Sequence, residues 1–277
     1  MESTKTMEPT LLLYALAGTG LGILTLVYGD FALQWQPLPA WLPGRPTLAY
    51  VSGVWLLVGS CGILIRRTAL VSAMSLAIYQ VIWAVAKAAP VAQHPLIIAM
   101  WLGFCESVAF VVGAWLLVAL IKGRDTTRVD ASLLGSRGIA CARVVFGICC
   151  VVFGLSHFAY ADFSATMIPD WLPGHLTLVY LTGAAHVMAG MAIGSGVLSR
   201  LAATLEAAMM TSIVLLVHVP SLVDMPPPIF APTSRVQWTA LLIALSLAAS
   251  SWIVAASLRE PPWGWKMTTK SVAFPNT

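Results

Sequence analysis

The sequence carries little charge for its length. Of its 277 residues only 9% are Asp, Glu, Lys or Arg, whereas 59% are hydrophobic and the mean hydropathy is +0.87. A soluble domain carries about 25% charged residues, so the composition excludes a soluble enzyme and predicts an integral membrane protein that contacts the lipid bilayer. The net charge of +4 needs no nucleic-acid partner, because the basic residues lie where membrane topology places them.

Motifs for thiol and metal chemistry are also absent from the sequence. Its five cysteines include no Cys-x-x-Cys motif, and we interpret them as small apolar packing residues. No pair of candidate ligands has the close spacing of a zinc site, so no metal is predicted. The N-terminal segment lacks the pattern of a cleavable signal peptide, and we expect the first apolar segment to stay in the mature protein.

Long apolar segments make up most of the sequence. Each is near the ~20 residues that a membrane-spanning helix needs, and they fall at 10–28, 47–65, 69–90, 96–121, 138–158, 176–197, 200–220 and 235–257. The sequence therefore predicts an all-α integral membrane protein with eight transmembrane helices.

The chain contains the same pattern twice. Trp41-Leu-Pro-Gly and Trp171-Leu-Pro-Gly lie 130 positions apart, as do Tyr50 and Tyr180. Such self-similarity predicts two copies of one structural unit, here two four-helix-bundle repeats at 1–121 and 138–258. A cytoplasmic linker at 122–137 joins them and a cytoplasmic tail follows at 259–277. We expect the repeated residues of the outer loops to be structural: Asp30, Trp41, Pro43, Tyr50, Asp162 and Pro173.

Basic residues orient the predicted spans. With the N-terminus inside, eleven Lys and Arg residues fall in inner segments and three, Arg45, Lys87 and Arg235, in outer segments or their margins. The positive-inside rule then places both termini in the cytoplasm. Because each half has four spans, both halves enter the membrane in the same sense, as parallel repeats.

Three motifs of the second half resemble the DoxX-like family of four-helix membrane proteins. They are Gly154-Leu-Ser-His-Phe158, Met167-Ile-Pro-Asp-Trp-Leu-Pro173 and Tyr180-Leu-Thr-Gly183. The first half keeps the loop but has Thr25 in place of the family's His. Many members carry a Glu a few residues after Tyr-x-x-Gly, where this chain offers His186. Because the family includes a subunit of a thiosulfate:quinone oxidoreductase, the resemblance implies a bacterial-type inner membrane, a quinone ligand and a redox partner subunit.

Histidines are concentrated in the second half, and an ionisable group inside a membrane is a functional hypothesis by default. The first-half counterparts of His157, His186 and His218 are Thr25, Leu56 and Ala88. At ~1.5 Å per residue, His157 and His218 lie near the outer ends of their helices and His186 lies ~15 Å deep. A single histidine is more often structural, but this concentration favours a ligand site. The candidate ligand-binding residues are His157, His186, His218, Tyr180 and Trp171.

We therefore expect a redox-associated inner-membrane protein that binds a quinone-like or other small amphipathic ligand in an outward-facing pocket of the second repeat. Whether it is an enzyme, such as a quinone-linked oxidoreductase subunit, stays open, as does its oligomeric state. Haem is disfavoured, because it needs two axial ligands that face each other. One alternative is a non-catalytic scaffold or assembly factor that docks a partner through its outer loops, and another is a small-solute transporter. Arg143 and Glu206 lie at similar depths and are predicted to form an ion pair.

Overall fold

The computed structural model describes residues 7–122, 133–223 and 234–258. These residues form helices and turns without any strand, which confirms the all-α prediction. The predicted linker falls mostly, and the predicted tail wholly, outside the described residues. The long helices are α2 (Met7–Tyr28), α3 (Arg45–Gly62), α4 (Ala69–Gln93), α5 (Ile98–Lys122), α6 (Ser136–Ala159), α8 (His175–Ser195), α9 (Ser199–Ile213) and α11 (Arg235–Ser257). The short ones are η1 (Leu33–Trp35), α7 (Ala161–Ala165), η2 (Val214–His218) and α10 (Val219–Ser221).

Seven helical segments are long and apolar enough to cross a membrane, so the chain is a multi-pass membrane protein. They correspond to seven of the predicted spans, and α9, η2 and α10 together make one of them, Ser199–Ser221. The 18-residue helix α3 is not among the seven. It begins with Arg45 and Pro46 and contains several serines and glycines, which lower its hydropathy.

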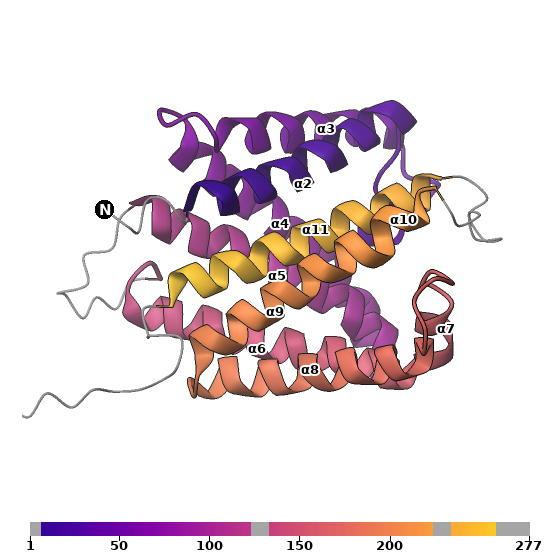
Figure 1. Ribbon diagram of the computed structural model, residues 1–277. Helices are drawn as coiled ribbons and strands as arrows, with labels where there is room; N and C mark the ends of the chain where they lie inside the picture. Colours follow the sequence, from indigo (N-terminus) through magenta and orange to yellow (C-terminus); the bar gives the residue numbers. More distant parts are fainter. Residues whose placement is uncertain (1–6, 123–132, 224–233, 259–277) are drawn as a thin grey trace, which may run out of the picture.

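The long helices lie side by side with alternating direction (Figure 1). The two most buried spans, α5 and α11, contact each other at the centre. Helix α2 packs against α3 and α11, while α6 packs against α8 and α5. The first helix of each half therefore lies against the last helix of the other half. Among the described residues neither half closes into a four-helix bundle of its own, whereas the sequence predicts two four-helix-bundle repeats.

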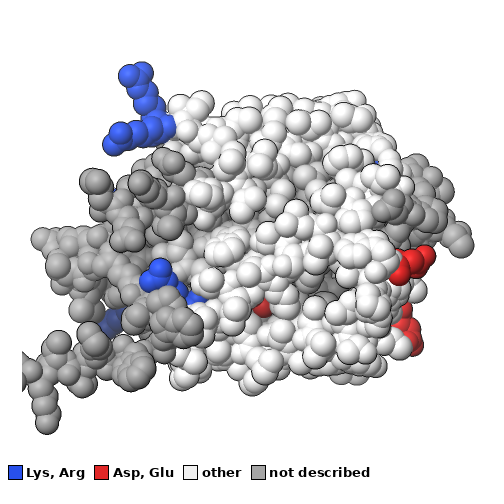
Figure 2. Space-filling model, in the orientation of Figure 1, with Lys and Arg blue, Asp and Glu red and all other residues white. Residues whose placement is uncertain are grey.

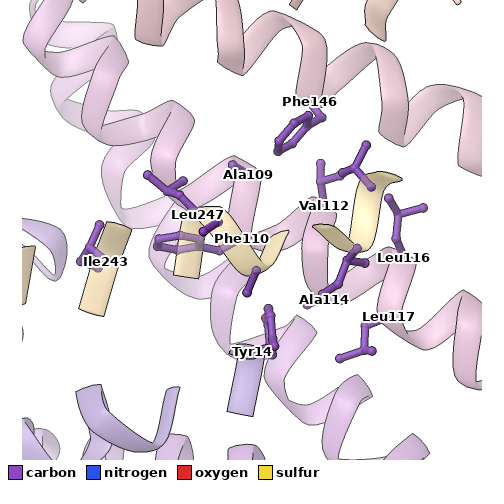
Figure 3. Close-up of a cluster of buried hydrophobic side chains, with 14 of the residues drawn as sticks. Tyr14, Ala109, Phe110, Val112, Ala114, Leu116, Leu117, Phe146, Ile243 and Leu247 are labelled. Atoms are coloured by element: carbon purple, nitrogen blue, oxygen red, sulfur yellow. The ribbon is translucent and has the colours of Figure 1, made fainter. Parts of the chain in front are cut away.

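The central core lies where α2, α5, α6 and α11 meet (Figure 3). Tyr14 of α2, Phe110 of α5, Phe146 of α6 and Leu247 of α11 are all buried there. Lipid tails are as apolar as leucine, so van der Waals packing, and not removal from water, holds such a core together.

Glycines bring α6 and α8 unusually close. A methyl group on Gly154 would clash with the carbonyl oxygen of Gly183, and one on Gly147 would lie 2.6 Å from that of Gly190. Small residues at helix contacts allow backbones in membranes to approach in this way. The first half has a similar contact, because a methyl group on Gly22 would lie 2.8 Å from the Gly53 carbonyl oxygen.

Two further backbone features recur in both halves. Gly44 and Gly174 adopt the left-handed conformation, with φ of 68° and 71°, directly before α3 and α8, where residues other than glycine are strained. Pro90 and Pro220 lie 130 positions apart near the ends of corresponding helices. Pro90 stays within α4, whereas Pro220 follows the π-helical segment η2.

Charged side chains are separated between the two ends of the molecule (Figure 2). Basic residues gather where α4, α6 and α9 begin, and acidic residues gather at the opposite end, which carries α7. Arg45 and Arg235 lie at the acidic end, and both lie beside Asp30. The wide face between the two ends in Figure 2 is almost free of charge.

Candidate functional site

One face of α6 carries the first candidate residue. Cys150, Phe153 and His157 recur at intervals of three and four residues, which places them on the same side of the helix. The His157 Nδ1 atom lies 2.9 Å from the Phe153 carbonyl oxygen. A carbonyl only accepts, so Nδ1 donates its hydrogen and the Nε2 of a neutral ring is left as an acceptor. The His157 side chain is half-buried.

A second histidine and a carboxylate lie deeper in the same unit. His186 of α8 and Glu206 of α9 share a hydrogen bond of 2.8 Å between Nδ1 and Oε1. Both side chains are buried, with 2% and 1% of their surface exposed. The second carboxylate oxygen of Glu206, Oε2, has no hydrogen-bond partner among the described residues. Removing an ionisable pair from water costs free energy, so a buried pair of this kind is a candidate functional feature.

The two histidine rings lie next to each other. Their centroids are 5.2 Å apart, and the Phe153 ring meets His186 edge-on at 6.0 Å. The contact of α6 and α8 at Gly183 explains this closeness, because a methyl group there would lie 2.9 Å from the His157 Cβ atom. The side chains of His157, His186 and Glu206 thus form a polar series from the half-buried edge of the protein to its interior, which we call the histidine–glutamate series.

The predicted ion pair between Arg143 and Glu206 is wrong. Equal depth along two helices does not make two side chains face each other, and the partner of Glu206 is His186. The Arg143 guanidinium lies instead against Gly196, at the C-terminal end of α8, where helix carbonyls favour a cation.

The structure brings Tyr180, but not Trp171 or His218, to the site. Tyr180 stacks on Phe158, the neighbour of His157, with ring centroids 6.1 Å apart, and both rings are partly exposed. Trp171 lies exposed in the loop before α8. His218 lies in η2, and within the described ranges it makes no hydrogen bond or ring contact with His157 or His186.

The sequence predicts Glu206 only as the ion-pair partner of Arg143 and not as a ligand-site residue, although the internal repeat holds a signal for that role. The residues 130 positions before His186 and Glu206 are Leu56 and Leu76. Both leucines are buried, at 3% and 1% exposure. The second half therefore holds a polar pair where the first half holds two leucines, and comparing the halves along α9 as well as α8 would have revealed it.

The loop between α2 and α3 contacts the helices through Asp30, Tyr50 and Phe31. The Asp30 carboxylate forms two ion pairs. Its Oδ1 atom lies 2.7 Å from Nη2 of Arg45, and its Oδ2 atom lies 3.5 Å from Nη2 of Arg235. Tyr50 places its hydroxyl against Gly29. The Phe31 side chain of this loop is buried, whereas the Trp41 side chain is exposed.

In the second half the corresponding loop is less tied to the helices. Asp162 has no ion pair in the part of the chain that the structure describes. Pro43 and Pro173 each lie just before the left-handed glycine that starts the next helix. Among the described residues, no group of three or more His, Cys, Asp or Glu side chains is placed to hold a metal ion.

One known protein family matches the part of the chain that contains the site. Residues 146–255 match the family described as Domain of unknown function (DUF8561). The matched segment contains His157, His186 and Glu206. No curated protein and no solved structure matches the chain.

Proposed function

We propose that the chain is a redox-associated membrane protein that binds a quinone headgroup, or a similar amphipathic ring with a hydroxyl or carbonyl group, beside His157. The histidine–glutamate series carries this proposal. It combines a half-buried imidazole, which a ligand in the membrane can reach, with a buried His186–Glu206 pair 5.2 Å behind it, measured between the imidazole rings.

The hydrogen bonding of His157 suits the reduced form of such a ligand. Its Nδ1 hydrogen is donated to Phe153, so Nε2 of the neutral ring accepts a hydrogen bond from a quinol hydroxyl. When His157 takes up a proton, the Glu206 carboxylate stabilises the positive charge through His186. The oxidised ligand then accepts a hydrogen bond from Nε2 of the protonated ring.

Aromatic surface next to His157 supports a planar ligand. Phe158 and Tyr180 stack with an interplanar angle of 17°, and 41% and 49% of their surfaces are exposed. Such ring faces bind other planar rings by offset stacking. The resemblance of the flanking motifs to DoxX-like proteins points to a quinone in particular, and to a redox partner subunit that consumes or supplies its electrons.

The architecture that we propose is eight spans in two parallel repeats, with α3 as the eighth span. Val51, Val54 and Val58 lie at helical spacing on α3 and are exposed, as lipid-facing residues are. Reciprocal contacts between the halves support the repeat. Arg235 lies over the Tyr28 ring at 4.9 Å, and the Ala99 N–H donates to the Tyr160 hydroxyl at 3.2 Å.

The same proposal places the protein in a bacterial-type inner membrane with both termini in the cytoplasm. The basic end in Figure 2 is the end where α4, α6 and α9 begin, and the positive-inside rule assigns such an end to the cytoplasm. His157 then lies toward the outer side.

A scaffold is the second candidate function. Trp41 and Trp171 expose 78% and 56% of their surfaces in equivalent outer loops, and exposed tryptophans are frequent anchors of protein interfaces. In that case the histidines are incidental, and variants of Trp171 or Asp162, but not of His157, would abolish function.

A ligand titration separates these two functions. We expect decylubiquinol to quench the tryptophan fluorescence of the purified protein saturably in mild detergent. His157→Ala should weaken binding roughly 5–30-fold, which corresponds to about 1–2 kcal/mol for one lost hydrogen bond. His218→Ala and His94→Ala are matched controls and should bind like the wild type. Equal binding by the wild type and His157→Ala would reject the site and favour the scaffold.

A further inference from the structure

Two small cavities lie side by side among the helices of the first half and α11. One has a volume of about 20 Å³ and includes Tyr14, Ser60 and Ser246 in its lining. The other has a volume of about 30 Å³ and includes Gln36, Tyr79 and Ser107. They adjoin, because both are lined by Leu21, Leu56, Gln80 and Phe110.

The first cavity is bordered by two buried hydroxyl groups, those of Tyr14 and Ser60. Tyr14 and Ser60 are buried, with 6% and 1% of their surface exposed. The Ser60 Oγ atom has no hydrogen-bond partner within the described ranges. The Tyr14 hydroxyl interacts with the side chain of Gln80, which also lines this cavity. The Ser60 hydroxyl lies against Gly18, where any larger residue would displace it, and Gly18 lines the same cavity. Buried polar atoms are normally paired with protein or with ordered water.

The second cavity is bordered by a polar network that reaches the outer part of the first half. The Tyr79 hydroxyl bonds Ser52 at 2.7 Å and accepts a hydrogen bond from the Gln36 amide. Trp35, which also lines this cavity, bonds the Glu106 side chain. Glu106 in turn attracts Lys87, whose Nζ atom donates to the Gly103 carbonyl at 2.8 Å.

We propose that these cavities form a water-binding site, in which a file of ordered water molecules is joined through the Gln80 side chain. A buried water needs roughly 10–15 Å³ and two to four polar partners, and both cavities meet this requirement. Organic ligands occupy pockets of about 300–1,000 Å³, so a quinone does not fit. The file leads from Tyr14 and Ser60 toward Trp35 and the Lys87–Glu106 pair, and hydrates the polar groups of a half that lacks the histidine–glutamate series.

Radiolytic hydroxyl-radical labelling tests this proposal, because radicals formed from bound water modify the side chains that touch it. The comparison is between Phe110, which lines both cavities, and Phe146, which lies in the same core on α6 (Figure 3). In the full-length protein in nanodiscs, we expect Phe110 to be modified severalfold faster than Phe146. Equal rates of modification would overturn the proposal.

A variant tests the role of Gln80. Gln80→Leu removes the one polar side chain common to both cavities, so Phe110 modification should fall to the rate of Phe146. Unchanged modification of Phe110 in a folded Gln80→Leu protein would contradict a file joined through Gln80. His157→Ala should leave Phe110 labelling unchanged, so the outcome is independent of the proposed quinone site. If Gln80→Leu does not fold, the wild-type comparison of the two phenylalanines decides.

Discussion

The Nδ1 atom of His186 lies 2.8 Å from Oε1 of Glu206, at two positions where the first half of the chain has leucines. The exchange of Leu56 and Leu76 for an ionisable pair places polar groups in the least favourable environment a protein offers. A fold that needed only packing here would have kept the leucines in both halves. The difference between the halves therefore supports the proposal of a functional site at this pair.

Restoring the leucines tests this interpretation through stability. His186→Leu or Glu206→Leu alone leaves one polar partner buried and should lower the free energy of unfolding by about 3–5 kcal/mol. The double variant His186→Leu/Glu206→Leu replaces the pair by apolar groups and should be as stable as the wild type or more stable by about 1–4 kcal/mol. Thermal unfolding in detergent, followed by tryptophan fluorescence, measures the order of stability of the wild type and the three variants. A double variant less stable than either single variant would show that the pair serves the fold.

The close contact between α6 and α8 leads to a second prediction. Gly154→Ala puts a methyl group into the Gly183 carbonyl and should destabilise the protein by about 1–3 kcal/mol through overpacking. It should also separate the rings of His157 and His186 and weaken decylubiquinol binding. Gly194→Ala is the control on α8, because a methyl group there meets no atom within 4 Å. If both variants unfold at the same temperature, the α6–α8 contact is looser than described.

Asp30 and Asp162 provide a matched pair in the corresponding loops of the two halves. Asp30→Ala removes two ion pairs, to Arg45 and Arg235, that tie the first loop to α3 and α11. All three side chains are partly exposed, so each pair should contribute less than about 1 kcal/mol. Asp162→Ala should leave the unfolding temperature unchanged, and high salt should reduce the difference between the variants. A larger loss in Asp162→Ala would indicate that the second loop is the better anchored one.

Membrane orientation is testable with single cysteines placed at the two ends. In a chain whose five native cysteines are replaced by alanine, Asp170→Cys lies at the acidic end and Leu133→Cys at the basic end, and both positions are exposed. An impermeant maleimide added to intact cells should label Asp170→Cys only, because the positive-inside rule puts the basic end in the cytoplasm. Labelling of Leu133→Cys alone would reverse the orientation.

The sequence predicted the features that depend on local pattern. Apolar length located seven of the eight predicted spans. The repeated motif aligned Gly44 with Gly174, which the structure shows in the same backbone conformation. The divergence between the halves pointed to His157 and His186, which lie together.

Features that depend on which helix faces are in contact could not be predicted. Depth along a helix suggested Arg143 for Glu206 and grouped His218 with His157, but depth says nothing about the direction in which a side chain points. The packing of α2 on α11 and of α6 on α5 joins segments from different halves, and no local pattern records such a contact.

The quinone content of the purified protein tests the central proposal most directly. Lipid extracts of the wild type and of His186→Leu/Glu206→Leu, purified from the same membranes in mild detergent, would be quantified by mass spectrometry. We expect quinone in near-stoichiometric amount with the wild type. The double variant should still fold but retain severalfold less quinone, because Glu206 no longer stabilises the protonated His157. Equal quinone content in the two proteins, or none in either, would contradict a ligand site at the histidine–glutamate series.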